Sequence, residues 1–292
     1  PGSSQGAFSV GKNILQFENT AYFSETSHNI INYESVQTAL DFSVRFGAFL
    51  EKLELNIDGN FQMEKIDDLR YVPVRRSEVS NFKFLRIGAK YLVYDPKKGL
   101  EDKPNYYSYW ADKKFSFKNL IPAVSIYSGI NIDSENNPYT AYGVKGISPT
   151  ISIILQSNFS KRSVLICNLI GDRIGSKQND YGYILSITHA FTGRFISYIE
   201  NQAIISDFYA DNKIALGVAY LINKNIQLDI GSSLNFKTTP KIFTLSFGYS
   251  HRFNLNSKEW LLSKKLTQKM NFLSLLNSPL SYIKIQNFGY LL

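Results

Sequence analysis

Apolar and polar residues alternate with a period of two over long stretches of the chain, which is the pattern of β-strands with two different faces. In the segment 53–64, Leu, Ile, Phe and Met occupy odd positions, while Glu, Asn, Asp and Gln occupy even ones. At about 3.3 Å per residue this segment spans about 40 Å, which is longer than most strands of soluble domains. The preceding segment 34–47 alternates in the same way, so a hairpin is predicted with its turn at 48–51.

The same alternation recurs along the chain and predicts twelve strands. Their ranges are about 13–24, 34–47, 52–64, 82–94, 120–132, 148–159, 163–171, 180–191, 194–206, 210–222, 225–236 and 241–253. An even number lets the chain enter and leave a closed antiparallel sheet on one side. We therefore predict an all-β fold, in which residues 1–253 form a closed antiparallel transmembrane β-barrel.

The connections between the predicted strands also suit an outer-membrane barrel, which has short periplasmic turns and long external loops. The short turns on one side are 48–51, 160–162, 192–193 and 223–224. The long loops on the other side are 25–33, 65–81, 133–147 and 172–180. The connection 95–119 departs from this rule because it is long on the periplasmic side, and the last two external loops are short.

A soluble β-sandwich or lipocalin-like barrel is the alternative, because periodicity alone does not tell which face points inward. The length and number of the strands favour the membrane. So do aromatic residues near predicted strand ends, such as Phe191, Tyr220 and Phe253, where interfacial girdles lie. In a membrane barrel Leu55 and Ile57 face lipid, and the predicted location is the bacterial outer membrane.

Composition narrows the possible functions. The chain of 292 residues is 44% hydrophobic and 14% aromatic, which excludes a disordered chain. It has no apolar run of about 18 residues that would form a transmembrane helix. The single Cys167 excludes internal disulfides and Cys-rich zinc sites, and His28, His189 and His251 are scattered. We therefore expect no metal and no cofactor.

The net charge of +8 does not indicate a nucleic-acid partner, because half of it lies after residue 253. The remaining body carries only a small excess of basic residues. The start, Pro1 to Ser4, shows no charged and apolar regions of a signal peptide. Localisation is therefore inferred from the barrel pattern, and outer-membrane lipid is the expected partner.

If the polar faces line a lumen, charged residues of the second to fourth predicted strands line it. The candidate lumen-lining residues are Asp41, Arg45, Glu54, Asn56, Asp58, Arg86 and Lys90. Opposite charges on neighbouring strands pair across the ladder. Two interpretations stay open: a charged constriction that selects solutes, or an ion-pair network that fills the lumen.

These acidic and basic candidates balance, which predicts weak ion selectivity. Later predicted strands place smaller or uncharged residues on the same face, which predicts an asymmetric lumen; examples are Ser152, Ser186, Gly217 and Gly231. In the predicted loop 65–81, acidic and basic residues alternate closely. That loop could attract an anionic ligand or fold inward, but a solvated loop of mixed charge is the favoured interpretation.

An enzyme is the next class to consider, because twelve-stranded barrels can carry a phospholipase, which needs a Ser beside a His. His189 and His251 alternate with lipid-facing residues, and no phospholipase motif surrounds any serine. Cys167 alternates with Leu165 and Leu169, so it behaves as a small lipid-facing residue. We predict no catalytic residues and no enzymatic activity.

Several segments resemble a group of Bacteroidota outer-membrane proteins that are described as transporters and are akin to the phenol-degradation MetA-pathway family. The matching segments are PGSSQGAFSVGKNILQFE (1–18), VRFGAFLEKLEL (44–55), IGAKYLVY (87–94), NKNIQLDIGSSLN (223–235) and FGYSHRF (247–253). The resemblance covers residues 1–253 and implies a channel-like protein that passes small, including apolar, solutes. The sequence departs from the group by its start at Pro1 and its added tail.

The tail 254–292 has a different pattern and is predicted to be a basic amphipathic C-terminal extension. Leu262, Leu266 and Met270 recur at helical spacing, and Pro279 ends the pattern. It is either a helix that contacts the inner leaflet or a protein partner, or an extension without fixed structure. The favoured function is a passive channel. The alternative is a non-conducting structural subunit of a larger outer-membrane or secretion complex.

Overall fold

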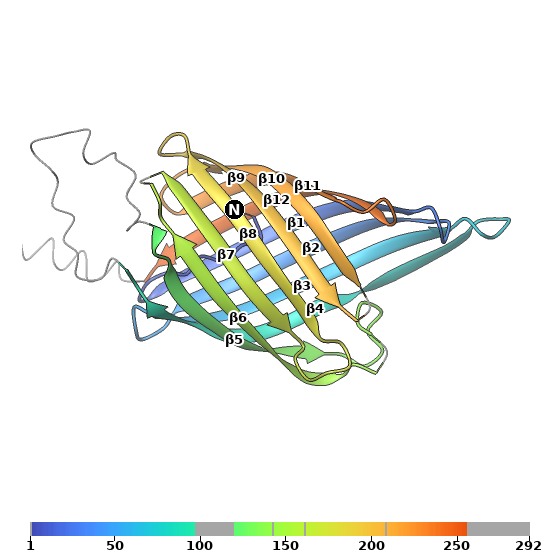
Figure 1. The fold of residues 1–292 in the computed structure, drawn as a ribbon, viewed down its shortest axis with the longest axis horizontal. Helices are drawn as coiled ribbons and strands as arrows, with labels where there is room; N and C mark the ends of the chain where they lie inside the picture. Colours follow the sequence, from blue (N-terminus) through green and yellow to red (C-terminus); the bar gives the residue numbers. More distant parts are fainter. Residues whose placement is uncertain (1, 97–119, 142, 161, 208, 256–292) are drawn as a thin grey trace, which may run out of the picture. The chain divides into compact units, whose positions relative to one another are not determined.

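A computed structural model describes residues 2–96, 120–141, 143–160, 162–207 and 209–255. These residues form one closed antiparallel barrel in which each strand pairs with its neighbours in sequence, and β12 closes against β1 (Figure 1). The strands are β1 (Ile14–His28), β2 (Tyr33–Gly47), β3 (Leu53–Asp68), β4 (Arg75–Tyr94), β5 (Ala123–Asp133), β6 (Gly146–Ser157), β7 (Ser163–Asp172), β8 (Asp180–Ala190), β9 (Phe195–Ser206), β10 (Ala210–Leu221), β11 (Ile226–Asn235) and β12 (Lys241–Asn254). The predicted fold class is confirmed.

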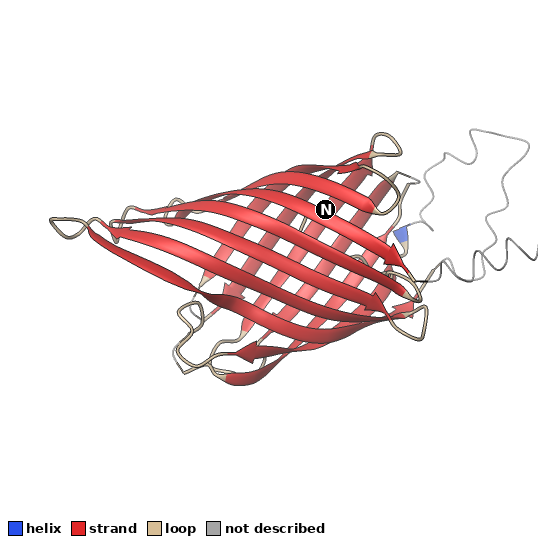
Figure 2. Ribbon diagram, turned by 180° about the vertical axis from the view of Figure 1, so that it is seen from behind, coloured by secondary structure: helices blue, strands red, loops and turns tan. Residues whose placement is uncertain are grey.

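The outer face of the barrel is apolar and the inner face is polar. On β3, Leu55 and Ile57 are 43% and 44% exposed, whereas Glu54 and Asn56 beside them are 0% and 1% exposed. A soluble barrel would show the reverse, so the exposed apolar band identifies a barrel that spans a membrane. Figure 2 shows the strands crossing this wall obliquely, as they do in transmembrane barrels. The outer-membrane prediction holds, and the soluble alternative is wrong.

No helix among the described residues is long and apolar enough to cross a membrane.

The β3–β4 hairpin reaches farther than its neighbour β5. β4 pairs with β3 from Arg75 to Tyr91, but its pairing with β5 begins only at Arg86. The hairpin therefore projects at one end of the barrel (Figure 1). The first half of β4, from Arg75 to Leu85, consequently has an edge that no neighbouring strand covers.

The predicted loop 65–81 is wrong, because most of it is strand. Only 69–74 connects β3 to β4. This part of the hairpin shows no alternation of apolar and polar residues, because both of its faces meet water and carry charged side chains. Lys65, for example, pairs with Glu78 at 3.1 Å, and both are exposed. At the tip, hydrogen bonds from Arg70 lower the pKa of Asp68 to about 2. The segment is solvated and its charges are paired, and it does not narrow the lumen.

The predicted loop 25–33 is also mostly strand, since β1 continues to His28 and β2 begins at Tyr33. The loops 134–145 and 173–179 lie where loops were predicted. The connection 97–119 and the extension 256–292 fall outside the described residues, and with them the predicted amphipathic helix.

Candidate functional site: the lumen and the segment inside it

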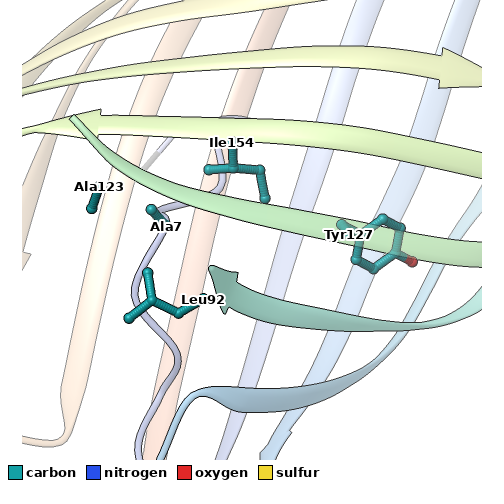
Figure 3. Close-up of a cluster of buried hydrophobic side chains, with 5 residues drawn as sticks. All are labelled: Ala7, Leu92, Ala123, Tyr127 and Ile154. Atoms are coloured by element: carbon teal, nitrogen blue, oxygen red, sulfur yellow. The ribbon is translucent and has the colours of Figure 1, made fainter. Parts of the chain in front are cut away.

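The N-terminal segment, residues 2–13, lies inside the barrel before β1 begins. It has no regular secondary structure, and Ala7 is completely buried. Figure 3 shows Ala7 among side chains from three strands of the wall. These are Leu92 on β4, Ala123 and Tyr127 on β5, and Ile154 on β6. The apolar cluster of the lumen is therefore built around this segment, which sequence reasoning did not place there.

One half of the N-terminal segment is hydrogen-bonded to β3, β4 and β5, and the contact to β5 is the hydroxyl of Ser125, which donates to the carbonyl oxygen of Ala7. The backbone N–H of Val10 donates to Oε2 of Glu54 at 2.9 Å. Nζ of Lys90 donates to the carbonyl oxygens of Gly6 and Phe8 at 3.0 and 3.2 Å. Because the segment has no strand or helix bonds of its own, these side chains satisfy backbone groups that would otherwise be buried without partners.

The other half continues across β6, β7 and β9. The N–H of Ala7 donates to Oε1 of Gln156 at 2.9 Å. The amide of Asn168 exchanges two hydrogen bonds with the backbone of Gln5, in the orientation that matches donors to acceptors. The N–H groups of Ser3 and Ser4 donate to the two oxygens of Glu200 at 3.2 and 3.1 Å. The segment thus follows the inner wall from β3 to β9.

Two networks of ion pairs lie on the side that the segment covers. In the first, Arg45 lies 3.2 Å from Glu18 and 3.4 Å from Glu54, and Lys90 lies 3.1 Å from Glu54. The carboxylate of Glu54 is therefore shared by two cations. This network connects β1, β2, β3 and β4.

The second network lies toward the end of the barrel that carries the loop 134–145. Arg86 reaches Asp172 at 3.0 Å and donates to Asn131 at 2.8 Å. Arg173 lies 3.1 Å from Asp133 and 3.5 Å from Asp172. A side chain from β4 is thereby connected to β5, β7 and the loop after β7.

The structure places all seven candidate residues on the inner face. They are Asp41, Arg45, Glu54, Asn56, Asp58, Arg86 and Lys90. It brings Arg45, Glu54 and Lys90 together in the first network. The amide of Asn56 has no hydrogen-bond partner among the described residues.

Asp58 and Arg86 are opposite each other on β3 and β4, but each binds a different partner. Asp58 accepts a hydrogen bond from Ser43 at 2.6 Å, while the long side chain of Arg86 extends past β5 to Asp172 on β7. Asp41 accepts a hydrogen bond from Asn60 and forms no ion pair with a described residue. Strand register fixes which residues are neighbours, but not which of several carboxylates a long cation selects.

Sequence reasoning missed several charged residues of the inner face. They are Glu18, Asp133, Asp172, Asp180, Glu200, Asp211, Lys213, Asp229 and Arg252. Alternation contained the signal, because Glu200 lies in the series Tyr198, Glu200, Gln202. The expected balance of charge rested on three strands only. Over the described inner face, acidic side chains outnumber basic ones.

The loop 134–145 covers the open edge of β4. Asn137 donates to the carbonyl oxygen of Phe82 at 2.7 Å. The hydroxyl of Tyr139 donates to the carbonyls of Gln62 and Val79 at 3.4 and 3.2 Å. Burial, and then the negative charge of Glu64, raise the pKa of Tyr139. This loop occupies the position beside the β3–β4 hairpin that a strand would otherwise take.

Apart from Glu200 on β9, which the N-terminal segment covers, the inner face of β8–β12 is less covered, and we call it the open side. Ile204 and Lys213 point inward and are exposed, and Gln202, Ser233 and Thr244 are half-buried. On β5 and β6, by contrast, the inward side chains are almost all buried. The lumen is therefore asymmetric: the segment and the ion pairs bury the inward side chains of one side, and those of the other side are less buried.

A Ser–His pair lies on the outer face, where the sequence showed no motif. Oγ of Ser163 and Nδ1 of His189 are 2.8 Å apart, and the pair bridges β7 and β8. Ser163 is buried, and the His189 ring contacts Phe191 edge-on. Among the described residues no carboxylate or amide is bonded to this imidazole, so the orienting group of a catalytic triad is lacking.

These features define an outer-membrane β-barrel whose lumen is partly filled by its own N-terminal segment. The chain belongs to the family described as "Putative MetA-pathway of phenol degradation", whose model matches residues 1–253. No curated protein matches the chain.

Solved structures with the same fold are distant in sequence. An outer-membrane channel from Pseudomonas putida F1 is 10% identical with a TM-score of 0.53, over 87% of this chain and 99% of that one. The KdgM porin is 10% identical with a TM-score of 0.46, over 81% and 99%. At such identities the first similarity supports the fold alone.

Proposed function

We propose that this protein is a passive channel through which small solutes cross the bacterial outer membrane along the open side of the lumen. The observation that carries the proposal is the contrast between the two sides of the inner wall. Ile204 and Lys213, near the ends of β9 and β10, remain exposed on the inner face, whereas the inward side chains of β5 and β6 are almost all buried. Partial filling narrows a pore without removing it, which suits selective passage of small molecules.

A channel explains the inner face better than an enzyme does. Most of its charged groups bind one another or the N-terminal segment, and none of the networks holds a nucleophile beside a base. The only Ser–His pair found among the described residues lies on the outer face and lacks an orienting group. We therefore assign the protein a transport role without catalysis.

The solutes we propose are small and include apolar ones. The family description names phenol degradation, and the open side offers Ile184 and Ile204 beside polar residues. An aromatic compound of phenol size can contact both kinds of side chain. The sequence resemblance further supports an origin in the Bacteroidota, which we keep as part of the proposal.

The test is conductance in planar bilayers, with the full chain and with a variant that lacks residues 2–10. We expect measurable conductance from the full chain and a several-fold larger one from the deletion, because the deletion removes the segment from the lumen. The double variant Ser3→Ala, Ser4→Ala is the control, since it keeps the N–H groups that Glu200 binds. Absence of conductance from both the full chain and the deletion contradicts the proposal.

A non-conducting structural subunit of a larger envelope complex is the second candidate. The observation that favours it is that the N-terminal segment is fixed at both ends: Glu54 on β3 binds Val10, and Glu200 on β9 binds Ser3. We propose that such a subunit would contact its protein partner through the extension 254–292. Cross-linking in whole cells, with and without residues 256–292, tests this candidate independently of conductance.

A further inference from the structure

We infer that three short turns at one end of the barrel bind the headgroups of anionic phospholipids in the periplasmic leaflet of the outer membrane. The turns are 158–162, 191–194 and 222–225, which join β6 to β7, β8 to β9 and β10 to β11. Each turn carries one described cation, and we call these three residues the basic rim: Arg162, Arg194 and Lys224. The inference goes beyond the proposed channel function, because it concerns the outside of the barrel and does not depend on conductance.

The basic rim lies at the end of the barrel where the chain enters β1 and leaves β12. The loop 134–145 and the tip of the β3–β4 hairpin lie at the opposite end (Figure 1). Outer-membrane barrels have short turns in the periplasm and longer loops outside the cell. The basic rim therefore faces the periplasm, where the adjoining leaflet of the membrane consists of phospholipids.

The positive charge of the basic rim is not offset by nearby carboxylates. The three turns contain no Asp or Glu. All three cations are exposed, and none has an ion pair with a carboxylate in the described part of the chain. At the opposite end, by contrast, the exposed Lys65 and Lys145 pair with Glu78 and Glu135, each at 3.1 Å.

Acidic residues at the periplasmic end lie elsewhere on the circumference. Among the described residues outside the strands at this end, they are Glu51, in the turn before β3, and Asp95, which follows β4. The turns between β6 and β11 are separated from them by β5 and β6. One arc of the rim is therefore basic.

Aromatic side chains on the outer face show the depth at which the basic rim lies. Phe195 on β9 and Tyr220 on β10 are cross-strand partners, and they are 38% and 47% exposed. The ring of His189 at the end of β8 contacts Phe191 edge-on. Exposed aromatic residues of this kind lie at the level of the lipid headgroups. Arg194 directly precedes Phe195 in the chain, so the basic rim lies at the depth of the lipid phosphates.

The shape and chemistry of the rim suit a lipid surface better than a soluble acidic protein. Neighbouring strands are about 4.8 Å apart, so successive turns are about 10 Å apart and the cations follow an arc. An arc can contact several headgroups of one leaflet at once. The same turns expose Phe191 and Ile222, by 54% and 45%. Apolar side chains beside cations enter the boundary between headgroups and acyl chains, whereas an acidic partner in water would leave them without a role.

The experiment compares spin-labelled phosphatidylglycerol with spin-labelled phosphatidylcholine around the full chain folded in phosphatidylcholine vesicles. Electron paramagnetic resonance separates lipid in contact with the protein from bulk lipid. We expect phosphatidylglycerol to associate about threefold more strongly or better, because basic side chains near the surface attract anionic lipid. Raising the salt concentration should bring the ratio of the two association constants towards one, since exposed charges are screened.

The triple variant Arg162→Gln, Arg194→Gln, Lys224→Gln should bring the same ratio close to one, with the extension 254–292 still present. Heat-modifiable gel migration shows whether the variant is folded. If the triple variant does not fold, Arg194→Gln alone should lower the ratio in part, and the wild-type ratio also decides.

The matched control is Lys65→Gln, Arg76→Gln, Lys145→Gln, which removes three exposed cations from the opposite end of the barrel. It should leave the ratio unchanged. A wild-type ratio near one overturns the inference and leaves the basic rim to a soluble acidic partner. A ratio that the triple variant does not lower, or that the control lowers equally, overturns it as well. A failure of the proposed channel function would be seen in conductance and would leave this ratio as it is.

Discussion

Lys90 and Glu54 form an ion pair on the inner wall, with Nζ and Oε1 3.1 Å apart and side chains 1% and 0% exposed. Both also bind the N-terminal segment: Glu54 accepts from Val10, and Lys90 donates to Gly6 and Phe8. One buried pair therefore joins β3 to β4 and fixes the position of the segment. Its loss is expected to change both stability and conductance.

Lys90→Met is predicted to destabilise the barrel by about 3 kcal/mol, because it leaves Glu54 buried with fewer partners. The double variant Lys90→Met, Glu54→Gln should recover part of that loss, since the penalty lies in the uncompensated charge. Urea unfolding from lipid vesicles measures both. The single variant Glu54→Gln completes the cycle. If the loss in the double variant equals the sum of the losses in Lys90→Met and Glu54→Gln, the two residues are not paired.

The matched control is Lys65→Met, which removes a lysine from the exposed pair with Glu78 on the β3–β4 hairpin. Exposed ion pairs contribute about 0–1 kcal/mol. A loss at Lys65 as large as that at Lys90 would show that the assay responds to charge removal in general. Of the two substitutions, only Lys90→Met should also raise the conductance, because Lys90 binds the N-terminal segment and Lys65 does not.

Glu200→Ala is predicted to free the start of the N-terminal segment. Two N–H groups lose their charged acceptor, and hydrogen bonds to charged groups are worth roughly 1.5–3 kcal/mol each. In a Cys167→Ser, Ser4→Cys background, maleimide labelling should accelerate by about tenfold or more, as those energies imply. Gln202→Ala, which changes a neighbour of Glu200 that does not bind the segment, is the control. Unchanged labelling would mean that Glu200 does not position the segment.

Tyr139→Phe is predicted to loosen the loop 134–145, because its hydroxyl bonds two carbonyls of the β3–β4 hairpin. Burial and Glu64 raise the pKa of Tyr139. The stabilisation that the Tyr139 hydroxyl gives to the loop is therefore complete below the ordinary pKa of about 10. It is lost as pH rises through the higher pKa of the folded state. Amide exchange of β4 residues 75–85 should show this alkaline loosening in the wild type but not in Tyr139→Phe. Tyr181→Phe, on the outer face, should behave like the wild type.

The sequence predicts the barrel well because the wall obeys a strict period of two. Leu55 and Ile57 point outward and Glu54 and Asn56 inward, as the alternation indicates. The prediction fails where that contrast disappears. On the β3–β4 hairpin beyond Lys65, both faces meet water, so the backbone ladder continues without any apolar face to reveal it.

The candidate site is less predictable because it depends on contacts across the lumen. Register makes Asp58 and Arg86 neighbours, but only the folded barrel brings Asp172 within reach of Arg86. The segment 2–13 has no strand pattern, and its place inside the barrel follows from hydrogen bonds to strands far along the chain. Glu200, which holds its start, lies 197 positions from Ser3.

Ile57→Arg is the direct test of the membrane face. A transmembrane strand needs about 9–11 residues, so Ile57 on β3 lies near the middle of the membrane-spanning part. Arginine there should cost about 2–4 kcal/mol, measured as a lower free energy of unfolding from lipid vesicles. Ile57→Leu keeps an apolar side chain and should cost less than about 1.5 kcal/mol. Asn56→Leu tests the neighbouring position on the inner face. Because it removes an amide without a hydrogen-bond partner among the described residues, it should be tolerated far better than Ile57→Arg. If arginine at Ile57 is tolerated better than leucine at Asn56, the outer face meets water and the barrel does not span a membrane.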